Sequence, residues 1–109
     1  MKASEIKHRA NEFLAATISR LRGESFATFR EWPDYPASSK IDLGVPEELY
    51  EQKCVFTVMK DTLPNGDIRV AVQYARHRFI ATDMAVDGFI ISADGTLKEL
   101  SEQDRWDLT

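Results

Sequence analysis

The chain has 109 residues, of which 43% are hydrophobic and 29% are charged. This length and apolar content are typical of one ordinary globular domain, so we expect a single domain over residues 1–109. Its 14 basic and 18 acidic residues leave a formal net charge of −4, which argues against nucleic-acid binding through a basic face.

An amphipathic helix is predicted over residues 4–22. Its apolar side chains recur at the spacing of one helix face: Ile6, Ala10, Phe13, Leu14, Thr17, Ile18 and Leu21. Ser4 is the expected N-cap, and Gly23 is the expected stop after the last turn. The apolar stripe predicts that this helix packs on a sheet.

Residues 26–32 are predicted to form a strand that ends at Pro33, because the composition is rich in residues that favour strands. A continuation of the first helix is the alternative. Residues 33–46 contain three of the four prolines and form a long loop, a kind of segment that often carries function. Residues 46–51 form either a short helix with Pro46 at its first position or irregular chain.

A β-hairpin is predicted over residues 54–79, because two apolar runs flank the turn sequence Pro64-Asn65-Gly66. With Leu63 to Gly66 as its tip, Thr62 lies opposite Asp67. Side chains alternate along a strand, so this register gives an apolar core face. That face consists of Val55, Thr57, Met59, Ile68, Val70, Val72 and Tyr74.

The opposite face of the hairpin is mixed in this register. It carries Phe56, Val58, Lys60, Arg69, Ala71, Gln73 and Ala75. Its apolar centre predicts self-association as a homodimer through the sheet, unless the long loop covers this patch.

After the hairpin, residues 80–88 are ambiguous, because Thr82-Asp83 and Asp87-Gly88 both have turn character. Residues 89–92 form a short apolar strand, and Asp94-Gly95 marks a second hairpin turn into residues 96–98. Ser101 is the expected N-cap of a short helix that reaches Leu108. The chain as a whole predicts an α+β fold, with an N-terminal amphipathic helix packed on a four- or five-stranded antiparallel sheet and a short C-terminal helix.

The sequence contains no glycine-rich phosphate loop, no calcium-loop spacing and no GxSxG, CxxC or HExxH pattern. We therefore predict no catalytic residue, no metal ligand and no cofactor, and the sequence leaves open whether the protein is an enzyme. Cys54 and His77 would be near-diagonal neighbours on the hairpin, which is one arrangement for a nucleophile. The competing interpretation makes Cys54 a small buried hydrophobic residue.

A single cysteine cannot form an internal disulfide bond. No apolar run approaches the length needed to span a membrane, and the N-terminus has no signal-peptide core. We therefore expect a cytoplasmic protein with no membrane association.

The candidate binding residues fall into two groups. Arg69, Arg76, His77 and Arg78 form the one local excess of positive charge, which would bind an anion or an acidic partner or pair with the chain's own carboxylates. Trp32 and Tyr35 lie in the proline-rich loop, where they would contact a partner or anchor the loop to the core.

The small size, the negative charge and the lack of a catalytic motif favour an interaction or accessory protein of inhibitor or immunity type. Such a protein acts by covering the surface of a protein partner, which the sequence does not identify. The alternative is a small-ligand-binding or enzymatic domain with a pocket between the helix and a curved sheet, to which Tyr74, His77 or Asp83 would contribute polar groups.

Overall fold

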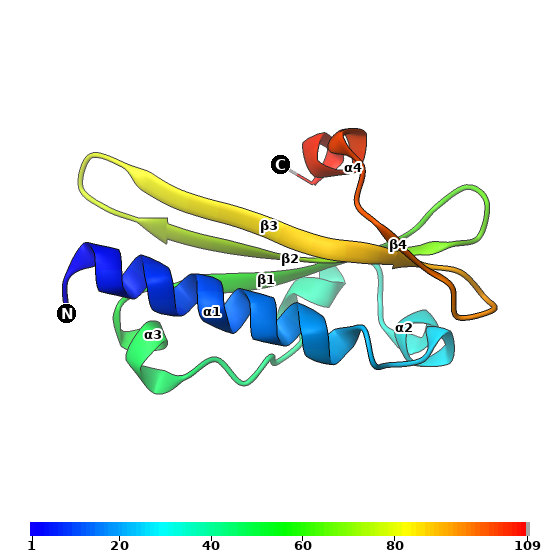
Figure 1. Cartoon of the computed structure of the whole chain (residues 1–109), viewed down its shortest axis with the longest axis horizontal. Coiled ribbons are helices and arrows are strands. Elements are labelled where there is room, and N and C mark those ends of the chain that lie inside the picture. Colours follow the sequence, from blue (N-terminus) through cyan, green and yellow to red (C-terminus); the bar gives the residue numbers. More distant parts are fainter. Residues whose placement is uncertain (109) are drawn as a thin grey trace.

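The computed structural model describes residues 1–108, and Thr109 lies outside the described residues. Within this range the helices are α1 (Ala3–Leu21), α2 (Phe26–Glu31), α3 (Glu47–Glu51) and α4 (Glu102–Asp107), with a 3-10 turn, η1, at Ala37–Lys40. The strands β1 (Val55–Thr62), β2 (Ile68–His77), β3 (Thr82–Ile91) and β4 (Leu97–Glu99) form an antiparallel sheet in that order. The predicted α+β fold is confirmed, with α1 along one face of the sheet and α4 on the other (Figure 1).

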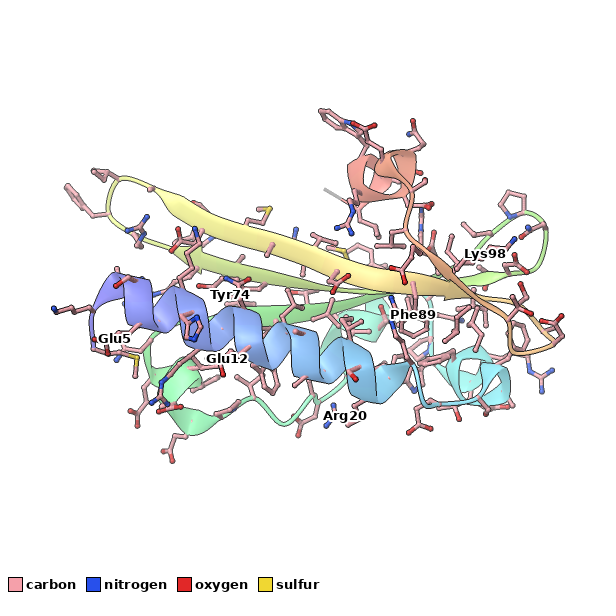
Figure 2. The ribbon with its side chains drawn as sticks, viewed as in Figure 1. Glu5, Glu12, Arg20, Tyr74, Phe89 and Lys98 are labelled. Carbon is pink, nitrogen blue, oxygen red and sulfur yellow. The ribbon has the colours of Figure 1, made fainter. Side chains whose placement is uncertain are left out.

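The main core lies between α1 and the sheet. The helix contributes a stripe of buried side chains, as predicted: Ile6, Ala10, Leu14, Thr17, Ile18 and Leu21. They pack with the core that includes Tyr74 and Phe89, which lie between α1 and the sheet in Figure 2. The helix ends at Leu21, two residues before Gly23, but the predicted N-cap is wrong. Lys2 occupies the N-cap position without a side-chain hydrogen bond, so Ser4 lies inside the first turn.

The turn between β1 and β2 contains three residues, Pro64, Asn65 and Gly66. The Leu63 N–H donates to the Asp67 carbonyl at 2.8 Å, and the Gly66 N–H donates to the Leu63 carbonyl at 2.9 Å. Gly66 has φ of 91°, a left-handed conformation that glycine adopts without a steric penalty. A turn of this kind adds one residue to the tip, so Thr62 pairs with Ile68 and the predicted pairing with Asp67 is wrong.

This shift by one residue reverses the faces of β1. The predicted core face of β2 is correct, because Ile68, Val70, Val72 and Tyr74 are buried. On β1, however, Val58 is fully buried and faces α1, whereas Val55 is 54% exposed on the other side. Phe56 and Lys60 turn inward together with Val58. The face away from α1, called the outer face below, therefore carries Val55, Thr57, Met59 and Asp61 from β1.

The strand predicted over residues 26–32 is wrong, since residues 26–31 form α2. The Ser25 side chain accepts a hydrogen bond from the Thr28 N–H at 3.3 Å, which caps the helix. Phe26 and Phe29 then lie three residues apart on one helix face, and Phe29 is completely buried. Pro33 follows the helix and prevents another turn.

The ambiguous residues 80–88 belong mostly to β3, which is as long as β2. Gly88 is the reason that the sequence resembles a turn at this point. A Cβ atom at Gly88 would overlap the Val70 carbonyl oxygen and the Ala71 Cα, so glycine permits β3 to approach β2 closely. The predicted turn at Asp94-Gly95 and the short helix after Ser101 are confirmed.

A second, smaller apolar cluster lies on the outer face beneath α4. It consists of Ala71, Leu100 and Leu108, with Met59, Val86 and Ile90 packed against it. The predicted capping role of Ser101 is confirmed, because its hydroxyl and the Asp104 carboxylate form a reciprocal capping box. The predicted mixed patch is thus wrong for Phe56, Val58 and Lys60, and α4 covers part of the outer face.

The register makes a direct prediction for β1. Val58→Asp places a carboxylate in a fully buried position and should lower stability by about 3 kcal/mol or more. Val55→Asp changes the same residue type at an exposed position and should cost about 1 kcal/mol or less. Thermal unfolding followed by circular dichroism measures both. A larger loss for Val55→Asp than for Val58→Asp would contradict this register.

Candidate interaction surfaces

The loop that carries Trp32 and Tyr35 is fastened along the free edge of β1. The Tyr35 N–H donates to the Lys60 carbonyl at 2.8 Å. The buried Ser38 hydroxyl donates to the Val58 carbonyl at 2.8 Å and accepts from the Lys60 N–H at 3.2 Å. These bonds occupy edge groups that would otherwise pair with another strand, and they fix the backbone of the loop.

Lys60 closes the same loop with its side chain, which is 5% exposed. Its ammonium group donates to the Trp32 carbonyl at 2.9 Å and forms an ion pair with Asp34 at 2.7 Å. The three-residue turn directs this side chain inward, and a buried ammonium group requires such partners. Lys60 thereby attaches the loop to β1 at two points, the Trp32 carbonyl and the Asp34 carboxylate.

The two aromatic rings of this loop have different environments. Trp32 is half-buried, with its ring edge-on to Phe29 at a centroid distance of 5.0 Å. Tyr35 is 52% exposed, although its own backbone is hydrogen-bonded to β1. Trp32 therefore anchors the loop, and Tyr35 presents an accessible ring on a fixed backbone.

Tyr35 forms one wall of an open groove of about 440 Å³ on the outer side of the sheet. The end of α4 forms the facing wall, and side chains of β1 and β2 form the floor. The lining residues are Tyr35, Met59, Lys60, Asp61, Arg69, Gln73, Asp107 and Leu108. We call this feature the Tyr35 groove.

Arg69 is the charged centre of the groove, and its side chain is only 9% exposed. Its Nε and Nη2 atoms donate to the two carboxylate oxygens of Asp61, at 2.9 and 2.6 Å. Asp61 is its cross-strand partner on β1. Its Nη1 atom donates to Asp104 at 3.0 Å and to Asp107 at 3.2 Å. A single guanidinium group thus joins two strands to α4.

The Arg69 cluster contains more carboxylates than cations. The Asp61 hydrogen bonds above all raise the pKa of Arg69, against the opposing effect of burial. Burial disfavours the Asp104 carboxylate, but the Ser101 N–H and hydroxyl and the Arg69 guanidinium outweigh it and lower the pKa of Asp104. Among the described residues, the Arg69 guanidinium faces the carboxylates of Asp61, Asp104 and Asp107, which leaves a formal charge of −2 in this cluster.

The basic residues Arg76, His77 and Arg78 lie at the opposite end of β2. Arg76 donates from Nε to the Gln52 carbonyl at 2.9 Å, and Arg78 forms an ion pair with Asp83 at 3.2 Å. The exposed His77 ring contacts the Thr82 hydroxyl at 3.0 Å through Nδ1. Both arginines are thus engaged within the chain. Val70 pairs with Lys60, which holds the Tyr35 backbone, and Arg78 follows Val70 by eight residues, so about 26 Å separates Arg78 from the strand row that holds Tyr35.

The structure does not bring Cys54 and His77 together. Cys54 is buried on the α1 side of the sheet, where the buried Tyr74 hydroxyl lies beside its thiol. Burial is the main cause that raises the pKa of the Cys54 thiol, and it raises the pKa of Tyr74 to about 12. His77 is exposed on the outer face, so the arrangement provides neither a thiolate nor a base beside it.

Sequence analysis placed Arg69 in the basic cluster and allowed for carboxylate pairing, but it missed the partners Asp61, Asp104 and Asp107 that join Arg69 to α4. Asp104 and Asp107 carried one available signal, because a spacing of three residues puts both carboxylates on one side of a helix. The other signal was Gly66, which sets the register that aligns Asp61 with Arg69. Neither signal alone predicts that α4 folds back over β2.

Comparison of the chain with protein family models, with curated proteins and with solved structures finds no match. Over residues 1–108, none of the helices is long and apolar enough to cross a membrane. The same residues contain no group of three or more histidine, cysteine, aspartate or glutamate side chains arranged to hold a metal ion.

The lowered pKa of Asp104 makes the attachment of α4 sensitive to acid. The unfolded value is about 3.9, so the contribution of ionised Asp104 to stability is complete above about pH 4 and is lost as pH falls through the folded pKa. Asp104→Asn should lower stability at pH 7 by about 1 to 3 kcal/mol, and the deficit should shrink below pH 4. Urea denaturation at both pH values measures this, with the exposed Glu102→Gln as control. An equal deficit at pH 7 and pH 3 would contradict this role of Asp104.

Burial of Cys54 predicts a slow thiol. Its labelling by a thiol reagent in the native protein should be at least about 100-fold slower than in the urea-unfolded chain, because exposure requires an opening of the fold. Absorbance of the released chromophore measures both rates. Equal rates in the two states would show that Cys54 is accessible.

Proposed function

We propose that this protein is a small cytoplasmic interaction or accessory protein, of inhibitor or immunity type, that acts by covering part of a partner protein. One observation carries this proposal. The Tyr35 ring is exposed while its backbone is held by β1, so little conformational entropy is lost when the ring is buried against a partner. Tyrosine on a rigid support is a residue type that dominates binding energy at protein interfaces.

The charge of the groove indicates the chemistry of the partner. The Arg69 cluster retains a formal charge of −2, and its carboxylates Asp61 and Asp107 are more exposed than Asp104. A lysine or arginine side chain of the partner would gain this attraction and would also stack on the Tyr35 ring. We therefore expect the partner to present a basic segment to the Tyr35 groove.

The basic residues at the far end of β2 have a smaller part in this proposal. Arg76 and Arg78 already bond the Gln52 carbonyl and Asp83, so a partner would have to replace those bonds. Arg76 and Arg78 follow Val70, the cross-strand partner of Lys60, by six and eight residues, or about 20 and 26 Å, which places them outside a compact contact centred on Tyr35. His77 remains exposed and available at that end.

The alternative, a ligand-binding or enzymatic pocket between α1 and the sheet, has less support. The side chains that meet there, such as Ala10, Val58 and Val72, have no exposed surface and fill the layer. Of the polar groups that would serve such a pocket, Tyr74 and Asp83 lie near Cys54, but Asp83 is paired with Arg78 and His77 is on the outer face.

Affinity purification from the native host, with mass spectrometry, identifies the partner, and titration calorimetry of the purified pair then tests the surface. Tyr35→Ala should weaken binding by about 30-fold, as expected for a central aromatic contact, with an unchanged melting temperature. Tyr50→Ala is the matched control, because Tyr50 is 75% exposed on α3, away from the groove. Equal affinity of Tyr35→Ala and wild type for the partner would contradict the proposed surface.

A further inference from the structure

One end of the outer face is apolar and uncovered. Val55, Ala75 and Met84 are direct cross-strand partners and form a row across β1, β2 and β3. Val55 and Met84 are each 54% exposed. In the described part of the chain, α4 lies on the outer face toward the β4 end of the sheet, and no helix lies on the outer face at the end near the β2–β3 turn (Figure 1).

This region carries no acidic, lysine or arginine side chain among its outward positions. The neighbouring rows on the same face hold Thr57, Gln73 and Val86 on one side and His77 and Thr82 on the other. The chain as a whole is 29% charged, so a run of outward positions without these residues is unusual for a solvated surface. Depletion of charge is typical of the central part of an interface.

The turn beside this row extends the apolar surface. Phe79 and Ile80 lie between β2 and β3 with exposed fractions of 103% and 90%. A turn normally carries small or polar residues, and two large apolar side chains in water have no role in stabilising the fold. We call these two residues, together with Val55, Ala75 and Met84, the bare end of the sheet.

The edges of the sheet are better protected than its face. Ser38 and Tyr35 occupy groups of the β1 edge, and β4 pairs with β3 at residues 89–91. On the remaining edge of β3, Arg105 of α4 donates to the Val86 carbonyl at 2.9 Å. Such coverage opposes strand addition, so contact through the face is the better route to association.

We propose that the bare end binds a second copy of this chain, as a two-fold symmetric dimer with the outer faces in contact. The chain has a net charge of −4, so copies repel one another through most of their surfaces. The row of Val55, Ala75 and Met84 is the exception, because this uncharged apolar part of the bare end meets its own copy without like-charge contacts. The centre of this contact lies one outward row beyond Gln73, the residue of the Tyr35 groove that is nearest to the bare end.

A two-fold axis across the strands near Ala75 accounts for the exposed turn. Ile80 lies five residues beyond Ala75, or about 16 Å along the strand direction. Rotation about this axis places the turn of one copy about 16 Å beyond Ala75 of its partner, in the direction of the partner's α4. Phe79 and Ile80 would then pack against the side of that helix and leave water.

The size of the bare end sets the expected affinity. Three strands at a spacing of about 4.8 Å, over about seven residues, give a footprint on the order of 300 Å². A standard interface buries about 800 Å² on each partner. The dimer should therefore be weak, with a dissociation constant of about 10 to 100 μM.

Sedimentation equilibrium of the full chain between about 5 and 500 μM tests this proposal. The wild type should change from 12.4 kDa toward twice that mass over this range. Val55→Glu and Met84→Glu should each weaken dimerisation at least 10-fold, because each buries a carboxylate in the contact. Tyr50→Glu introduces the same charge at an exposed aromatic residue on α3 and should dimerise as the wild type does.

Several outcomes would overturn the proposal. A wild type that remains at 12.4 kDa up to 500 μM would show that the bare end does not bind its own copy. Loss of dimer in Met84→Glu with an unchanged dimer in Val55→Glu would assign the contact to the β3 edge, since Val55 lies two strands away from that edge. Circular dichroism spectra of the variants that match the wild type ensure that the changes act on association.

Discussion

The turn from Leu63 to Asp67 is the constraint on which most of this structure depends. Gly66 adopts a positive φ and adds one residue to the tip, and this sets Thr62 against Ile68. Because side chains alternate along a strand, a change of one residue would exchange the two faces of β1. The turn therefore decides that Val58 fills the core and that Asp61 lies on the outer face.

The two charged side chains beside this turn attach the remaining elements to the sheet. Lys60 points inward and binds the loop through Asp34 and the Trp32 carbonyl, while Arg69 points outward and binds α4 through Asp104 and Asp107. A buried cation is costly without partners, so each side chain strongly favours the arrangement that supplies them. The Tyr35 groove is the space between the loop and the helix that these cations hold. The same geometry leaves the opposite end of the outer face uncovered, because α4 is too short to reach it.

Local patterns predicted the elements whose signals are contained in one segment. The stripe of α1, the hairpin, the turn at Gly95 and the N-cap at Ser101 were all visible in the sequence. The wrong predictions concern segments whose structure depends on residues distant in the sequence, or whose composition suits more than one type of element. Residues 26–31 suit a strand by composition, but the Ser25 cap and the burial of Phe29 make them a helix. Gly88 suggests a turn in the sequence alone. The reason for glycine at this position is the close approach to Val70 and Ala71, which can be recognised only when the partner strand is known. For the candidate site, the sequence indicated the Tyr35 loop, whereas the Arg69 cluster requires both the register and the return of α4.

The register itself is open to one direct measurement. The Lys60 N–H and carbonyl bond to Ser38 and Tyr35, so both groups point away from β2. Lys60 and Val70 are therefore a non-hydrogen-bonded pair, and Val58 and Val72 form the next such pair. In an antiparallel sheet the α-protons of such pairs lie close together. A nuclear Overhauser spectrum of the full chain should therefore show strong α-proton cross-peaks between Lys60 and Val70 and between Val58 and Val72. Strong α-proton cross-peaks between Met59 and Val70 and between Thr57 and Val72 in their place would show that the turn adds no residue and that the account is wrong.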